Sequence, residues 1–104
     1  MTRAKPDFKR IVDIMFVAGD RVAAQQIMDD VTRQRIPGLD EGNHHLRHRI
    51  FLAILKNSNG DIPRLTKEVE QAKIDWRDSL MTAGFESDQE AHHLWERQIL
   101  RNIG

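Results

Sequence analysis

Hydrophobic residues recur along this chain every three or four positions, the spacing that places them on one side of an α-helix. The alternation typical of an amphipathic strand is absent throughout. The pattern therefore predicts an all-α fold, and residues typical of helix ends divide the chain into five segments. The predicted helices cover residues 6–18, 20–35, 41–57, 62–83 and 88–102.

Chain length and short connections complete this architecture. A chain of 104 residues fits one domain with a modest core, so we predict a single helical domain over residues 1–104. Short connections favour antiparallel packing of neighbouring helices in one compact bundle.

The first two predicted helices are separated by a turn at Gly19. The apolar positions that end at Ala18 and those that begin at Ala23 would lie about 160° apart on one straight helix. Because one buried face cannot include both groups, the chain has to turn between them. We expect Gly19 to be left-handed and Asp20 to cap the following helix.

Local signals also mark both ends of the predicted third helix. Pro37 and Gly38 end the second helix, and Asp40 is a suitable cap for the third. The turn-forming residues 57–60 end the third helix.

The fourth helix has the most regular pattern in the chain. Asp61 and Pro63 open it, and Gly84 closes it with Phe85 packed back on the last turn, as in a Schellman motif. Its apolar stripe is the longest and includes Trp76, so we predict that this helix is the central scaffold and that Trp76 lies in the core.

The fifth helix begins with a capping box over residues 87–90. Helical spacing predicts its buried side, which consists of Ala91, Leu94, Trp95 and Ile99.

Composition and charge exclude several classes of function. Sixteen basic residues balance sixteen acidic residues, so the basic excess of a typical nucleic-acid-binding protein is absent. The chain has no cysteine, which excludes disulfides, zinc–thiolate sites, iron–sulfur clusters and thiol catalysis. It also lacks tyrosine, and its glycines do not form a phosphate-binding loop. We therefore expect a non-catalytic protein without a cofactor.

The beginning of the chain resembles a signal peptide only superficially. A basic stretch precedes apolar residues 11–18, but Asp13 interrupts the apolar part, which is also short. No segment approaches the ~18 apolar residues of a membrane span. The sequence favours a cytoplasmic protein.

The predicted third helix is apolar on two sides in its later half. Opposite its main stripe lies a second stripe, formed by His44, His48, Phe51 and Leu55. If this stripe faces water, it is a surface for another protein, and antiparallel pairing of the helix with a second copy would bury it. Alternatively, the helix is sandwiched, with Phe51 and Leu55 packed against the first or fifth helix of the same chain. Protein–protein interaction, including homodimerisation, is the function that we predict.

A nucleic-acid-associated regulator is the leading alternative. Arg47, Arg49 and Lys56 lie in a stretch without acidic residues, residues 42–60, and would form a phosphate-facing patch. A helix-turn-helix across Gly19 is disfavoured because the would-be recognition helix has three aspartates against one arginine.

The second alternative is a metal-binding bundle. Two Glu-x-x-His pairs, Glu41/His44 and Glu90/His93, resemble those of carboxylate-bridged di-iron bundles. Both pairs fall in predicted first turns, where acidic residues are favoured without a metal, so we assign no metal ligands to them.

Histidines offer a different route to a metal site. His44, His45 and His48 lie close together on the predicted third helix, where two imidazoles four residues apart can bind one metal ion. A third ligand would have to come from elsewhere, for example from His92 or His93. Helical spacing does not say whether the fifth helix lies nearby, so we interpret these imidazoles as part of a solvated helix face.

Overall fold

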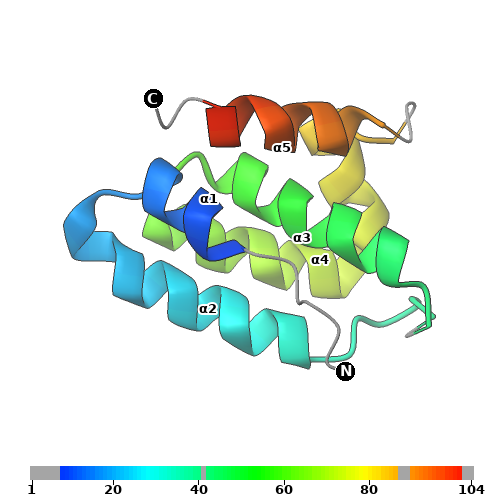
Figure 1. Cartoon of the computed structure of the whole chain (residues 1–104). Helices are drawn as coiled ribbons and strands as arrows, with labels where there is room; N and C mark the ends of the chain where they lie inside the picture. Colours follow the sequence, from blue (N-terminus) through cyan, green and yellow to red (C-terminus); the bar gives the residue numbers. More distant parts are fainter. Residues whose placement is uncertain (1–7, 41, 87–89, 102–104) are drawn as a thin grey trace, which may run out of the picture.

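Five α-helices and one short 3₁₀-helix form a bundle in the computed structural model, which describes residues 8–40, 42–86 and 90–101 (Figure 1). The described part of the chain contains no strand. The predicted all-α bundle of five helices is therefore confirmed. In chain order, the elements are α1 (Phe8–Met15), η1 (Ala18–Asp20), α2 (Arg21–Arg33), α3 (His44–Ser58), α4 (Ile62–Ala83) and α5 (Ala91–Arg101).

Helix α3 occupies the centre of the bundle. It packs along α4 and also contacts α5, and Figure 1 shows α2 and α5 on opposite sides of the α3–α4 pair. Six consecutive α3 side chains, from Ile50 to Leu55, are buried. Because a helix that is apolar on all sides has to be enclosed, α3 rather than α4 is the central helix.

The second apolar stripe of α3 lies inside the fold. Phe51 is 4% exposed and Leu55 is fully buried. The Phe51 ring meets Phe8 of α1 edge to face, with centroids 6.0 Å apart. The sandwiched alternative thus describes α3, and the expected water-facing stripe is not formed because α1 and other helices of the same chain cover it.

The connection between α1 and α2 turns at the predicted place by a different mechanism. Helix α1 ends at Met15, Phe16 inserts into the core, and the Asp20 amide donates to the Val17 carbonyl over 2.8 Å. Gly19 does not have a positive φ, and the Asp20 side chain forms no capping hydrogen bond. A 3₁₀ turn reverses the chain, so neither a left-handed glycine nor a capping aspartate is needed.

Helix α3 begins later than predicted. Its N-cap is Asn43, whose side chain accepts a hydrogen bond from the Leu46 amide over 3.1 Å. Asp40 instead accepts from the Gly42 amide over 3.0 Å, which folds the preceding loop. Glu41 lies outside the described residues.

Helix α4 has the predicted bounds and caps. Asp61 accepts a hydrogen bond from the Arg64 amide over 3.0 Å. At the other end, Gly84 is left-handed with φ 78°, and the Phe85 amide donates to the Leu80 carbonyl over 2.9 Å. These are the bonds of a Schellman motif, and they place Phe85 in the core.

A kink at Asp75 changes the expected position of Trp76. Asp75 has non-helical angles, φ −156° and ψ 97°, and its carboxylate accepts a hydrogen bond from the Arg77 amide. The kink leaves Ile74 79% exposed, and Trp76 is only partly buried, at the edge of the core. Trp76 therefore packs against the core rather than within it.

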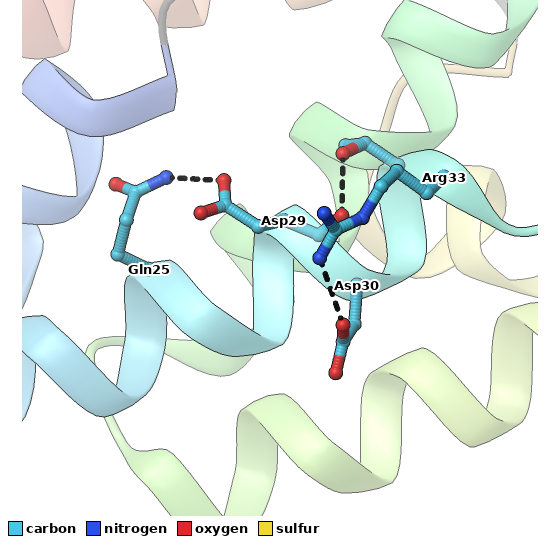
Figure 2. A network of polar contacts seen from close by, with 5 residues as sticks. Gln25, Asp29, Asp30 and Arg33 are labelled. Carbon is cyan, nitrogen blue, oxygen red and sulfur yellow. Dashed lines mark hydrogen bonds and ion pairs between the residues drawn. The ribbon is translucent and has the colours of Figure 1, made fainter.

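The outward side of α2 has polar side chains that pair three or four residues apart. Gln25 donates a hydrogen bond to Asp29 over 2.9 Å, and Arg33 pairs with Asp30 at 3.1 Å. Figure 2 shows both contacts. The exposed surface of α2 therefore has balanced charge, with Asp29 and Asp30 against Arg21 and Arg33.

Candidate metal centre

The first two turns of α3 and the first turn of α5 bring together four imidazoles, from His45, His48, His92 and His93, which we call the histidine cluster. The His45 ring centroid lies 5.2 Å from that of His92 and 6.0 Å from that of His93. The His48 centroid lies 6.1 and 6.5 Å from the same two rings. His92 and His93 themselves are 3.9 Å apart.

Three of these residues present donor atoms close enough to share one metal ion. One ring nitrogen from each of His45, His92 and His93 lies within 4.8 Å of the others. In a tetrahedral zinc site, with bonds of about 2.0–2.1 Å, the nitrogens are about 3.3 Å apart. The donor atoms therefore have to move closer together to bind one zinc ion, and the exposed side chain of His45 is not held in place by packing.

His92 is the most unusual member of the cluster. It is fully buried, and neither Nδ1 nor Nε2 has a hydrogen-bond partner in the described structure. An unsatisfied buried polar group costs about 1–3 kcal/mol. Burial, followed by the positive charge of His93 and Arg49, lowers the pKa of His92 to about 4. The ring is therefore neutral at pH 7, the form in which histidine binds metals.

Glu96 connects the two histidine-bearing helices. Its carboxylate lies 3.6 Å from Nε2 of His48 and 3.8 Å from Nδ1 of His93. A carboxylate beside one ring nitrogen orients a metal-binding imidazole and increases its basicity. Burial lowers the pKa of His48, and the charge of Glu96 opposes that shift. Glu96 thus has the position of a supporting carboxylate.

The remaining proposed partner-binding residues do not form one surface with this cluster. His48 stacks on Phe8 of α1 with centroids 5.6 Å apart, which makes it part of the α1–α3 contact. His44 is exposed at the start of α3. The stripe of His44, His48, Phe51 and Leu55 therefore extends from solvent into the core.

The proposed nucleic-acid residues are bound to backbone carbonyls of this chain. Arg47 donates to Thr32 near the end of α2, over 3.0 Å, and Lys56 donates to Ala83 at the end of α4, over 2.7 Å. Arg49 donates to the carbonyl just beyond α4. Cations are favoured at helix C-termini, where carbonyls lack helical partners. These contacts direct Arg47, Arg49 and Lys56 toward the C-terminal ends of α2 and α4.

The predicted buried side of α5 is wrong at Leu94. Leu94 is 51% exposed, whereas His92 takes the inner position, 6.2 Å from the Phe85 ring. The inner residues His92, Trp95 and Ile99 are also spaced by three and four. This spacing is the sequence signal that could have predicted a buried His92 and, with it, the histidine cluster. Residues 87–89 of the predicted capping box lie outside the described residues.

A comparison with protein-family models, with curated proteins and with solved structures found no match for this chain. Among the described helices, none is both long and apolar enough to cross a membrane. The chemistry of the histidine cluster is therefore the basis for a functional conclusion.

Proposed function

We propose that this protein binds one transition-metal ion of the zinc type through His45, His92 and His93. The observation that carries the proposal is His92, a fully buried imidazole with two unpartnered nitrogens beside two further imidazole donors. A bound metal would satisfy a buried nitrogen that is otherwise unpaired.

The ligand set defines the class of metal. Imidazoles suit zinc, copper and nickel ions, whereas magnesium and calcium ions prefer oxygen ligands. Glu96 would act as a supporting carboxylate because it already lies beside Nδ1 of His93, which leaves Nε2 of that ring to bind the metal.

The other candidate functions have less support. Protein binding through α3 depended on exposure of Phe51 and Leu55, and both are buried. Nucleic-acid binding depended on free basic groups, and Arg47, Arg49 and Lys56 each bind a backbone carbonyl. Metal binding instead uses His92, whose two buried nitrogens lack a partner.

Calorimetric titration of the untagged, chelator-treated protein with Zn²⁺ at pH 7.5 tests this proposal. We expect one ion per chain and no comparable heat with Mg²⁺. His45→Ala should weaken zinc binding at least tenfold. His44→Ala is the matched control, because His44 is an exposed neighbour outside the cluster. Absence of zinc binding, or an equal loss in both variants, would overturn the proposal.

A further inference from the structure

The three proposed ligands leave one position of a tetrahedral metal ion to be filled. Zinc sites with three protein ligands keep the fourth position for water or another exchangeable ligand. Glu96 and His48 lie close to each other but outside the group of donors within 4.8 Å. The exposed side chain of His45 places this position near solvent.

Arg49 supplies an unbalanced positive charge beside the same site. It lies one helical turn after His45, which puts both residues on one side of α3. Arg49 is only 9% exposed, one terminal nitrogen donates to the Phe85 carbonyl, and Nε is buried without a partner. None of the ion pairs within the described ranges includes Arg49.

The charges at the site favour an anion. A divalent ion and Arg49 together contribute three positive charges, against one negative charge on Glu96. A buried cation without an anion is costly, and a negative ligand on the metal would offset both charges. The charge of Arg49 already acts on His92, since it contributes to the low pKa of that imidazole.

We infer that the fourth metal position binds an oxyanion, a carboxylate or a tetrahedral oxyanion, with a second oxygen accepting a hydrogen bond from Arg49 Nε. This inference rests on the proposed metal function. One oxygen of such an anion can bind the metal while a second oxygen accepts from Arg49. A water molecule is neutral, so it cannot offset the charge of these two cations. The ligand is therefore a small oxyanion or an acidic group presented by a larger molecule.

Anion titrations of the protein loaded with one equivalent of Co²⁺ test the inference, because the visible spectrum of Co²⁺ responds to a change of ligand. Acetate or sulfate should change the spectrum saturably at constant ionic strength set with chloride. Acetamide, the neutral analogue of acetate, should have no effect, and this comparison needs no variant. A response to acetate alone assigns a carboxylate ligand, and one to sulfate alone a tetrahedral oxyanion.

A pair of arginine variants then tests the role of Arg49. Arg49→Lys should keep the Co²⁺ spectrum and weaken anion binding at least tenfold. Arg47→Lys is the control, since Arg47 also donates to backbone carbonyls but has no buried nitrogen without a partner. An unchanged Co²⁺ spectrum with every anion would overturn the oxyanion site and leave the metal site standing. Failure to form a Co²⁺ complex would instead overturn the proposed function.

Discussion

The two sides of α3 differ in how completely they are packed. Toward α4, the contact is mainly aliphatic and buried; Asn57 donates a hydrogen bond to the Ser79 carbonyl across it, and the Ser79 hydroxyl is buried without a partner. Toward α5, the contact consists of imidazoles, a shared carboxylate and aromatic rings, and it retains buried nitrogens without partners. The α3–α4 contact has the properties of a stable core, whereas the α3–α5 contact tolerates unsatisfied groups that a metal would use.

The largest expected difference between the two sides comes from truncating leucines. Leu52→Ala should lower the free energy of unfolding by about 4 kcal/mol, because Leu52 is fully buried among core residues that cannot collapse into the cavity. Leu94→Ala on the exposed side of α5 should change it by less than about 0.5 kcal/mol. Urea unfolding measures both values, and equal losses would contradict the assigned burial.

The turn between α3 and α4 is expected to be nearly as sensitive. Gly60 has φ 76°, and a Cβ atom added there would clash with the Met15 carbonyl oxygen. Gly60→Ala should therefore cost about 3 kcal/mol, from left-handed strain and from displacement of the end of α1.

A matched glycine provides the control for that variant. Gly19 has no heavy atom within 4 Å of an added Cβ and does not have a positive φ. Gly19→Ala should change stability by less than about 1 kcal/mol. If both alanine variants unfold at the same urea concentration, the conclusion that the turn at Gly60 packs closely against the end of α1 is wrong.

Zinc should strengthen the α5 side selectively. At a free concentration one hundred times the dissociation constant, a ligand that binds only the folded state adds about 2.7 kcal/mol. Hydrogen exchange should slow most at the amides of α5, because the ion would join α3 to α5. His44→Ala should retain the effect and His45→Ala should lose it, and protection confined to α4 would contradict the assignment.

Lowering the pH should reduce the stability of the metal-free protein through the α3–α5 contact, where His92 is buried. The pKa of His92 is lowered to about 4 in the folded state, against about 6.5 when unfolded, so the unfolded state binds more protons between these values. Stability is therefore complete above pH 6.5 and falls as the pH decreases toward 4, by about 1 kcal/mol at pH 5.5. Thermal unfolding in chelator measures this loss.

Replacing His92 tests whether this residue causes the loss of stability in acid. His92→Leu should reduce the pH dependence, because it removes the fully buried imidazole; His48, whose pKa is also lowered by burial, remains. A slope unchanged in this variant would show that another group causes the acid loss.

Residues typical of helix ends correctly predicted the helix boundaries that are set by hydrogen bonds within one turn. Asp61 and Gly84 set the ends of α4 through contacts within one turn, and both were predictable. The start of α3 was not, because Asp40 and Asn43 are equally good caps and the loop before α3 decides between them.

The histidine cluster depends on tertiary packing. His45 and His92 are far apart in the sequence, and their contact requires α5 to turn His92 rather than Leu94 inward. Helical spacing allows either His92 or Leu94 to face inward. Only the surface against which α5 packs distinguishes the two arrangements. The Asp75 kink that moves Trp76 outward also has no signal in the hydrophobic pattern.

Histidine side-chain NMR tests the central claim most directly. Long-range ¹H–¹⁵N correlations of the five imidazoles, recorded at pH 7.5 before and after one equivalent of Zn²⁺, report which ring nitrogens bind the ion. The account predicts metal-bound signals for His45, His92 and His93 and an unchanged signal for His44. Unchanged signals for all three proposed ligands, or a metal-bound signal for His44 in their place, would contradict it.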